Sequence, residues 1–395
     1  MIVLLKLVLH LIRPVGIPLL LACVSGTLSA AELDLGLRGS LLAGYESNPL
    51  RVSENEQGGA FSELRLDAGL NLGFTSRSGI FVELGGLQRV YESENSDADY
   101  GVANVKTGLN LILSRRGGND LAVSLGVRLG TGRSTFIDPR TGLAYEIPQG
   151  NSGNVADLAD RFNVDSLGTF LDIQWSVNRR VKLFLDALLE RNDFVEDYEF
   201  ESEVNSLDNR RLVLRPGIRI TPIRYFRITL SAARSEIDYD QWLARDQDGS
   251  EAPGAKTSYQ YTSYRLELDL APAANWDARL GIVDTDRQDQ YRGYYDFAGV
   301  TTFAWLQHKI GPRTRWTLYS SLGKLDYRNA TVTNDPASEI RSSDFFKARG
   351  LFERDVSDHL TLFFEAGTLS TDNTDSDYSY DRDWTLVGLK FRLSR

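Results

Sequence analysis

Cysteine, histidine and long apolar runs are all scarce in this sequence of 395 residues. The single cysteine, Cys23, lies near the amino terminus, so a mature chain that begins near Glu32 has no disulfide, thiolate metal site or cysteine nucleophile. Of the three histidines, only His308 and His359 lie in that mature chain, and neither accompanies a recognisable nucleophile motif. No later segment approaches eighteen consecutive apolar residues, which argues against a transmembrane helix. We therefore expect no enzymatic activity, no cofactor and no metal site.

The first 31 residues have the order of features of a secretory signal. Two basic residues precede an apolar run, and small residues from Ser29 to Ala31 follow it. This order predicts a cleaved signal over residues 1–31 and a mature chain over residues 32–395. Lipidation at Cys23 is the alternative, although Leu21 is bulky for a lipoprotein cleavage site.

Basic residues are too few to balance the acidic ones. The chain has 44 Lys and Arg against 54 Asp and Glu, and only basic residues (Lys6 and Arg13) precede Glu32, so the mature part carries about twelve net negative charges. Nucleic acid requires a basic footprint and is not an expected partner.

One amphipathic β-pattern is repeated about sixteen times after the signal. Between Arg211 and Ile220, leucine, proline and isoleucine fall on one face of an extended strand, while arginine and glycine fall on the other. Such segments run for roughly fifteen residues, against about five or six in a soluble sandwich, and about ten residues cross a bilayer. The sequence therefore predicts an all-β fold: a closed antiparallel transmembrane β-barrel of about 16 strands. A soluble antiparallel sandwich is the alternative.

The connections between these segments alternate between short turns and long acidic stretches. Short turns belong at the periplasmic rim of an outer-membrane barrel and long loops at the cell surface, in contact with lipid and lipopolysaccharide. We expect the strands near residues 32–46, 59–75, 79–93, 98–113, 119–134, 160–175, 179–196, 207–221, 224–241, 257–271, 274–290, 294–310, 312–328, 341–356, 357–371 and 380–394.

Aromatic residues gather near both ends of the strands and predict two girdles at the membrane interfaces. Those beside the short turns are Trp175, Trp276, Trp305 and Trp316. Those near the long loops are Tyr45, Tyr91, Tyr100, Tyr239, Tyr261, Tyr294, Tyr295, Tyr327 and Tyr380. Four further rings in the water-facing register are Phe170, Phe184, Tyr319 and Phe363, which either stack against sugar rings or pack against one another.

The water-facing register contains more basic than acidic residues, which favours a pore that admits anions. The basic candidates are Arg38, Arg65, Arg89, Lys106, Arg128, Lys182, Arg211, Arg215, Arg219, Arg227, Arg265, Arg279, Arg313, Arg315, Lys347, Arg349, Lys390 and Arg392. The acidic candidates are Glu63, Asp67, Glu83, Asp172, Asp186, Glu190, Glu267, Asp269, Asp277, Glu353 and Glu365. The densest basic run, formed by the arginines at positions 211, 215, 219 and 227, predicts a ladder for carboxylate or phosphate groups. Charges paired across a filled lumen are the alternative.

The longest connection, from Ser134 to Ala159, joins the fifth and sixth expected strands and contains Asp138, Arg140, Glu146 and Asp157. It resembles, by position, the loop that narrows the lumen of sixteen-stranded diffusion porins, and the resemblance implies a constriction. An ordinary surface loop is the alternative.

The first expected strand ends in Tyr45, Glu46, Ser47, Asn48 and Pro49. This segment resembles the start of a family of β-barrel porins whose first hairpin carries Tyr-Asp/Glu-Ser-Asn-Pro and whose members often accompany exopolysaccharide synthesis and export. The resemblance implies an outer-membrane conduit for exopolysaccharide that works with periplasmic partners. A passive diffusion porin for small anionic solutes and a structural or adhesion barrel sealed by its loops are the alternatives.

Overall fold

The structure of the protein is a computed structural model. It describes residues 32–53, 56–115, 119–134, 146–149, 154–157, 162–194, 199–200, 203–204, 207–332 and 337–394. The signal predicted over residues 1–31 lies outside the described residues.

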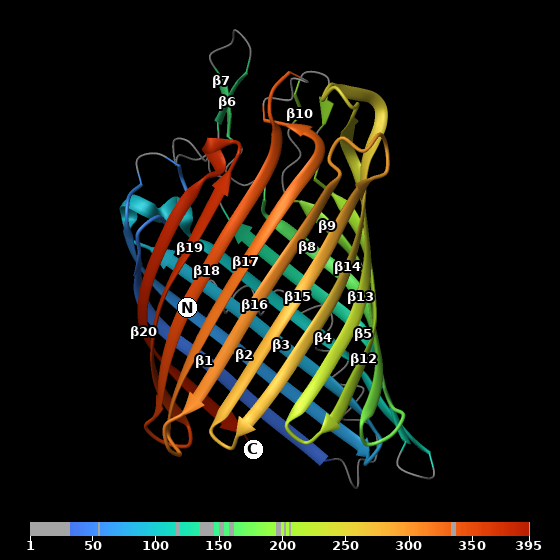
Figure 1. The fold of residues 1–395 in the computed structure, drawn as a ribbon, viewed down its shortest axis with the longest axis vertical. Helices are drawn as coiled ribbons and strands as arrows, with labels where there is room; N and C mark the ends of the chain where they lie inside the picture. The colour runs from blue at the N-terminus through green and yellow to red at the C-terminus, as the bar shows by residue number, and fades with distance from the viewer. Residues whose placement is uncertain are drawn as a thin grey trace.

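Sixteen antiparallel strands form a closed barrel, which confirms the predicted fold (Figure 1). Each strand pairs with the next along the chain, and the last strand pairs with the first to close the wall. The barrel strands are β1 (Glu32–Glu46), β2 (Gly59–Thr75), β3 (Ser78–Tyr91), β4 (Tyr100–Arg115), β5 (Asn119–Ser134), β8 (Val164–Ser176), β9 (Val181–Phe194), β12 (Asn209–Ile223), β13 (Phe226–Arg245), β14 (Glu251–Ala273), β15 (Trp276–Asp289), β16 (Phe297–Lys309), β17 (Thr314–Thr331), β18 (Ile340–Asp355), β19 (Leu360–Asn373) and β20 (Tyr380–Ser394). Closure leaves no unpaired strand edge, as a wall embedded in lipid requires.

Within the described residues, the long connections hold six small elements that the sequence pattern does not predict. They are η1 (Ser93–Ala98), β6 (Glu146–Gln149), β7 (Asn154–Asp157), β10 (Glu199–Phe200), β11 (Glu203–Val204) and η3 (Ser376–Tyr378). A strand of two to four residues is too short for its alternation to be recognised. Among the described residues, no helix has the length and apolar character needed to cross a bilayer.

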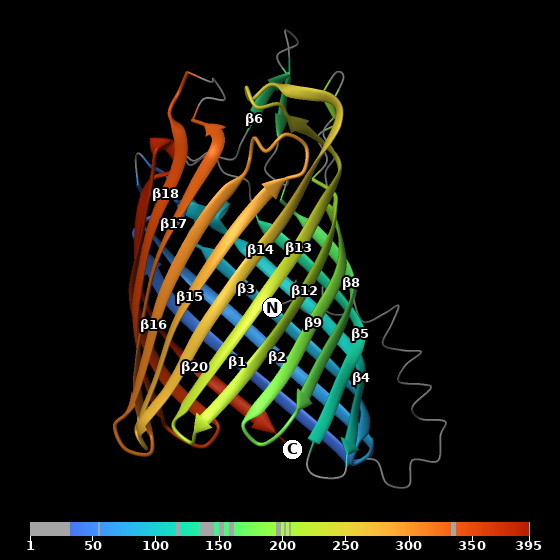
Figure 2. The ribbon, with the colours of Figure 1, turned by 45° about the vertical axis from the view of Figure 1, so that its right-hand side comes forward.

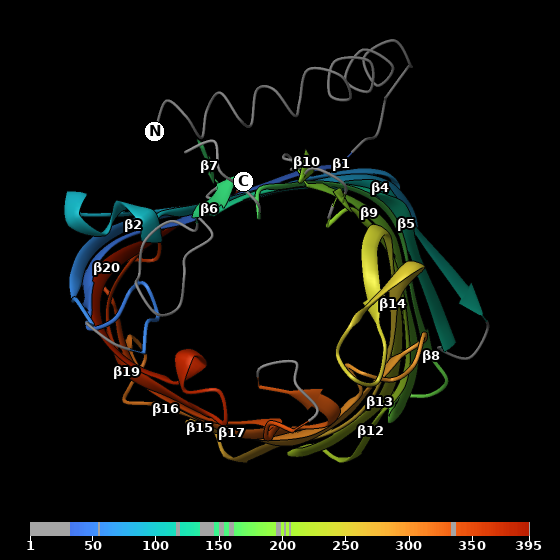
Figure 3. The same ribbon diagram turned by 90° about the horizontal axis from the view of Figure 1, so that it is seen from above.

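The β13–β14 hairpin extends well beyond the strands predicted for it. The connection expected over residues 241–256 is reduced to residues 246–250, because β13 continues to Arg245 and β14 begins at Glu251. The pairing register shifts between Asp238 and Leu243, so the alternation that identifies a strand is interrupted at this point. Seen from above, the extended end of this hairpin, drawn in yellow, bends inward over the mouth of the barrel (Figure 3).

One side of the wall is an exposed apolar surface. Leu41, Leu189, Leu318 and Leu322 are 47–55% exposed, and they share the outward face in the pairing register. An apolar surface that surrounds a closed barrel suits lipid rather than water. Towards the long loops the same face carries ion pairs instead, such as Arg234–Glu236 and Arg328–Asp286. The apolar band therefore has a polar upper limit.

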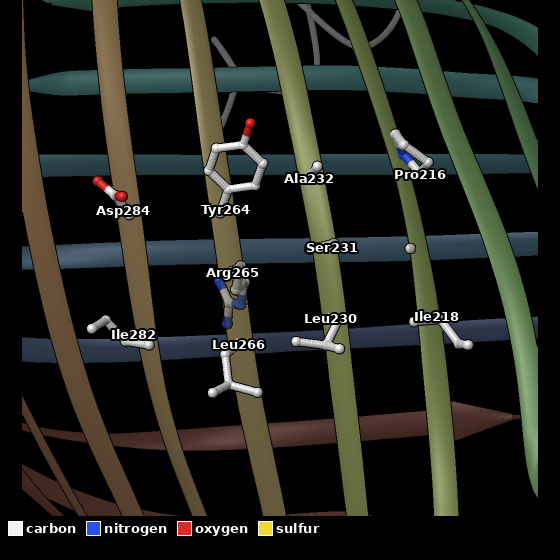
Figure 4. A pocket seen from close by; sticks show the side chains of 11 residues that line it. Pro216, Ile218, Leu230, Ser231, Ala232, Tyr264, Arg265, Leu266, Ile282 and Asp284 are labelled. Carbon is white, nitrogen blue, oxygen red and sulfur yellow. The ribbon is translucent and has the colours of Figure 1, made fainter.

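A shallow groove of about 570 Å³ lies on this outer face, across β12 to β15 (Figure 4). Ile218, Leu230, Leu266 and Ile282 line it, and small Ala232 leaves the hollow between them. Its apolar lining suits the acyl chains of the surrounding lipid, so we do not assign a substrate to it.

The predicted aromatic girdle exists on the outer face near the short turns. Trp276 stacks on His308 at a centroid distance of 4.1 Å, and the indole N–H of Trp316 donates to His308 Nδ1 at 3.2 Å. Trp305 is an exception, because it lies opposite Arg279 on the interior face. Consecutive side chains of a strand point to opposite faces, so a position near a turn does not determine which face a side chain takes.

The second predicted girdle, near the long loops, is wrong for most of its members. Tyr45 is outward and 52% exposed, but the other strand residues of that set share the interior face in the pairing register. These inward residues are Tyr91, Tyr100, Tyr239, Tyr261, Tyr327 and Tyr380. The rings that we expected in lipid instead line the upper interior of the barrel.

Candidate functional site

The interior wall of the barrel carries most of its charge, and the sequence-predicted pore-lining residues lie along it. All of the predicted pore-lining residues on the β9–β18 side except Arg313 are on strands and share the interior face; Arg313 lies in the short connection before β17. These strand residues include Lys182, Asp186, Arg211, Arg215, Arg219, Arg227, Arg265, Glu267, Arg315, Lys347 and Arg349.

Several interior carboxylates are shared by two cations each. Asp269 accepts from Arg227 Nε and from Arg279 Nε, both at 2.8 Å. Glu353 is 2.7 Å from both Arg315 Nε and Lys390 Nζ. A carboxylate held between two cations is fixed in position, and the wall around it keeps an excess of positive charge.

The predicted arginine ladder is only partly free to meet an anion. Arg215 is 2.8 Å from Asp186, and Arg227 is bound to Asp269. Arg211 and Arg219 form no ion pair with any residue that the structure describes. Some interior charges are therefore paired across neighbouring strands and others are not, and the anion ladder stays a prediction.

The Tyr45–Pro49 motif lies at the seam where β1 meets β20, and Glu46 is its centre. Glu46 is 1% exposed, and its carboxylate accepts hydrogen bonds from Arg89, Arg382 and the Tyr91 hydroxyl, the last at 2.7 Å. Arg89 comes from β3 and Arg382 from β20, so one carboxylate joins both ends of the chain through side chains. We call Glu46, Arg89, Tyr91 and Arg382 the seam latch.

Ser47 and Asn48 extend the contact between the two ends of the chain. Ser47 N donates to the carbonyl of Asp383, and Asp383 N donates to Ser47 Oγ at 2.8 Å. Asn48 is fully buried; its amide donates to the Val52 carbonyl at 2.8 Å and to the Asp381 carbonyl at 3.2 Å. These contacts give the motif a role in barrel closure.

A packed apolar cluster lies on the interior side of this seam. Leu42, Phe61, Tyr91, Phe363 and Leu386 are each less than a tenth exposed and form one cluster. Phe363 was a candidate for stacking against sugar, and here it packs against other side chains instead. The seam is therefore a structural part of the wall.

The densest group of rings lies on the interior face of the opposite wall, near the long loops. We call it the aromatic patch. It consists of Tyr239 and Trp242 on β13, Tyr259 and Tyr261 on β14, Tyr295 in the β15–β16 connection, Phe297 on β16 and Tyr327 on β17. Tyr259 is at its centre, with ring-centroid distances of 6.0 Å to Tyr239 and 6.2 Å to Tyr295. Tyr259 and Phe297 are buried, whereas the other five rings are partly exposed.

Arg287 on β15 lies among these rings. Its guanidinium carbon is 4.5 Å from the Phe297 centroid and 4.7 Å from that of Tyr259, and its Nε donates to the Tyr295 carbonyl at 2.8 Å. A guanidinium that packs flat against rings holds them apart and in fixed orientations. Sequence reasoning missed this arrangement, although the inward parity of Tyr259, Tyr261 and Arg287 indicates it.

Two other rings named from the sequence, Phe170 and Phe184, pack against neighbouring residues. Phe170 is 7% exposed, packs 6.0 Å from Phe81 and lies 4.1 Å from Lys106 Nζ. Phe184 covers Gly217 on the adjacent strand so closely that a Cβ there would overlap its ring. The structure thus shows packing against neighbours for Phe170 and Phe184; Phe184 and Tyr319 remain partly exposed, as do five rings of the aromatic patch.

The connection predicted to be a constriction is described only in part. Asp138 and Arg140 lie outside the described residues. Glu146 and Asp157 are opposite each other in the β6–β7 hairpin, which projects beyond the rim of the barrel (Figures 1 and 2). The described part of this connection is therefore a surface hairpin, and the constriction stays a prediction.

Groups of three or more His, Cys, Asp or Glu side chains with the geometry of a metal site do not occur in the part of the chain that the structure describes. His308 takes part in the outer aromatic girdle, and His359 lies in a short turn with its Nδ1 3.1 Å from the Arg392 carbonyl. Neither imidazole lies beside a candidate nucleophile among these hydrogen bonds.

Comparisons with known proteins find the fold in outer-membrane porins. No family model and no curated protein matches the chain. Among solved structures it is similar to in-vitro folded OmpT of Vibrio cholerae (9% identity, 92% of this chain and 100% of that one, TM-score 0.49). It is also similar to an anion-selective porin from Comamonas acidovorans (10% identity, 92% and 100%, TM-score 0.48) and to OccK1 of Pseudomonas aeruginosa (12% identity, 94% and 100%, TM-score 0.44). Substrate and mechanism do not transfer at these identities and scores.

Proposed function

We propose that this protein is an outer-membrane channel that conducts an exopolysaccharide. A closed barrel with an apolar outer face is the form in which strands cross a bilayer, and the short turns are then periplasmic. The observation that supports a glycan in particular is the aromatic patch, because its partly exposed rings face the interior rather than the lipid. Sugar rings present apolar C–H faces that pack on aromatic rings, while their hydroxyls bond to tyrosine and charged side chains.

The wall also suits a long hydrated chain. Neighbouring tyrosines on β13, β14 and β17 offer successive contacts along the interior, so no single sugar ring needs to bind tightly. The charged residues on the remaining strands keep the interior hydrated. The energy for movement has to come from partners, and the seam motif resembles that of barrels that accompany polysaccharide export systems.

The proposal is tested by replacing rings of the patch in the full chain. The wild-type protein and the variants are each expressed in a strain whose own gene is deleted. In that strain we expect the Tyr261→Ala/Tyr327→Ala double variant to give several-fold less surface polysaccharide than the wild-type protein, because the interior loses two sugar contacts. The measurement is cell-surface polysaccharide at equal amounts of folded barrel in the outer membrane.

The same strand supplies a matched control. Tyr264 is also on β14 but faces outward and is 60% exposed, so Tyr264→Ala removes a ring without touching the interior. Normal surface polysaccharide in the deletion strain without any copy of the protein would contradict the proposal. A loss with Tyr264→Ala equal to that of the double variant would show that the effect is on folding.

A passive porin for small anionic solutes is the second candidate, and the excess of interior basic residues favours it. The two functions differ in bilayer conductance and in phenotype. A porin gives a large steady anion-preferring current, and its loss reduces solute uptake while leaving surface polysaccharide unchanged.

A further inference from the structure

Directly opposed basic side chains occur on the interior face near the short turns. Lys182 on β9 lies opposite Arg219 on β12, and Arg38 on β1 lies opposite Arg392 on β20. Like charges directly opposite each other on one face of a sheet destabilise it. Two such pairs at the same end of the barrel therefore require a compensating interaction.

Nearby carboxylates do not supply this compensation for the first pair. On the same face, Asp186 is 2.8 Å from Arg215, and Asp269 is held between Arg227 and Arg279. Neither Lys182 nor Arg219 forms an ion pair with a residue in the described ranges. The Nε of Arg219 is inaccessible to solvent and has no hydrogen-bond partner among those residues. A buried N–H without an acceptor is costly, so the first pair has no compensation from the part of the wall that the structure describes.

The second pair has the same character. Arg38 and Arg392 are both exposed on the interior face, and within the described chain neither forms an ion pair. Asp67 is opposite Arg38 on β2, but their charged groups are not within ion-pair distance. Five strands separate β9 from β1 in the closed order, and seven separate β12 from β20, so the two pairs lie on opposite halves of the wall.

We propose that these two pairs, Lys182–Arg219 and Arg38–Arg392, form an anion-binding mouth at the short-turn end of the barrel. Their ligand is a chain that carries repeated carboxylate or phosphate groups. An arginine and its neighbour can bind two oxygens of one such group, and the anion removes the repulsion within the pair. This inference rests on the proposed function and narrows it, since it assigns an anionic rather than a neutral glycan.

The geometry also gives an order of contact. A chain that enters from the short-turn side meets the two basic pairs first and the aromatic patch, near the long loops, afterwards. Capture by charge acts at a distance, whereas ring contacts act only at close range. The first site therefore concentrates the chain at the mouth, and the second contacts its sugar rings.

Calorimetric titration of the purified full-length barrel in non-ionic detergent tests the anion-binding mouth. The probes are an oligogalacturonate, a linear polyphosphate of similar length and neutral maltoheptaose. We expect Lys182→Gln/Arg219→Gln to weaken oligogalacturonate binding about tenfold, with a similar effect of Arg38→Gln/Arg392→Gln. If phosphate is the preferred group, the two variants lose more affinity for polyphosphate than for oligogalacturonate. Maltoheptaose binding should not change in either variant.

The matched control removes two positive charges from the outer face. Arg234 and Arg328 are exposed there and paired with Glu236 and Asp286, so Arg234→Gln/Arg328→Gln keeps the interior intact. Absence of polyanion binding by wild type, or an equal loss in this control, would overturn the anionic mouth. If neither maltoheptaose nor oligogalacturonate binds, the glycan channel itself is contradicted. Binding of polyphosphate alone would favour the anion porin instead. Lys182→Glu gives a further check, because the new carboxylate pairs with Arg219 and should weaken oligogalacturonate binding at least as much as Lys182→Gln/Arg219→Gln without destabilising the wall.

Discussion

Replacement of Glu46 by alanine is expected to lower the free energy of unfolding by about 3–5 kcal/mol, because it leaves two buried guanidinium groups without their shared carboxylate. Glu46 is 1% exposed, and its partners Arg89 and Arg382 have side chains only 11% and 15% exposed. Water cannot readily replace a partner at such a site. The loss acts on the β1–β20 seam, where the barrel closes, so we expect opening to begin there.

Urea-induced unfolding of the barrel in detergent micelles, followed by tryptophan fluorescence, measures this effect. Glu46→Gln keeps the size and one acceptor, and should be less destabilising than Glu46→Ala. The control is Asp326→Ala, which breaks an outward ion pair with Lys324; the two side chains are 54% and 56% exposed, and a pair so open to solvent contributes little to stability. If both alanine variants lose the same small amount, the latch does not hold the seam.

The latch also explains what the first-hairpin motif does in this chain. The sequence pattern predicts only that the first strand ends near residue 46, within this motif. The structure adds that Glu46, Ser47 and Asn48 reach the last strand, more than three hundred residues later in the chain. Contacts between such distant segments have no local signature. A single sequence therefore shows the motif but not its partners.

The strands themselves were predictable because a wall with lipid on one face and water on the other imposes alternation on every residue. The prediction failed where this constraint ends. Above the apolar band both faces are polar, so the alternation is lost there. The strands predicted over residues 224–241 and 257–271 therefore stop short of the observed ends, since β13 continues to Arg245 and β14 begins at Glu251. The tyrosines of this region were given to the wrong face, since a single shift of parity reverses the direction of each side chain.

Pairing among interior charges was less predictable than their position. The alternation places Arg215, Arg219 and Lys182 on one face, but it does not predict which of them forms an ion pair with Asp186. Direct opposition across strands and diagonal reach of the side chains decide this: Arg215 is opposite Asp186, while Lys182 is opposite Arg219. These relations depend on strand register, which the turns and bulges set.

Replacement of Arg287 by leucine is expected to loosen the aromatic patch and to lower the free energy of unfolding by about 2–3 kcal/mol. The guanidinium lies within 6.0 Å of five ring centroids, those of Tyr259, Tyr261, Tyr295, Phe297 and Tyr327. Leucine retains apolar contact but loses the attraction of a cation for ring faces and the hydrogen bond to the Tyr295 carbonyl. The rings can then turn towards one another, so the partly exposed faces proposed to contact sugar are lost as well.

Two measurements separate this result from a general loss of stability. Near-ultraviolet circular dichroism reports the fixed packing of the rings, and calorimetric titration with maltoheptaose reports the sugar contact. Arg287→Lys keeps the charge without the planar group and should give an intermediate signal. The control is Arg265→Leu, because Arg265 is also an interior arginine over a ring, 4.9 Å from Phe303, but its side chain is 46% exposed. A dichroism change in Arg265→Leu as large as that in Arg287→Leu would contradict a special role for Arg287, since only the latter is surrounded by rings.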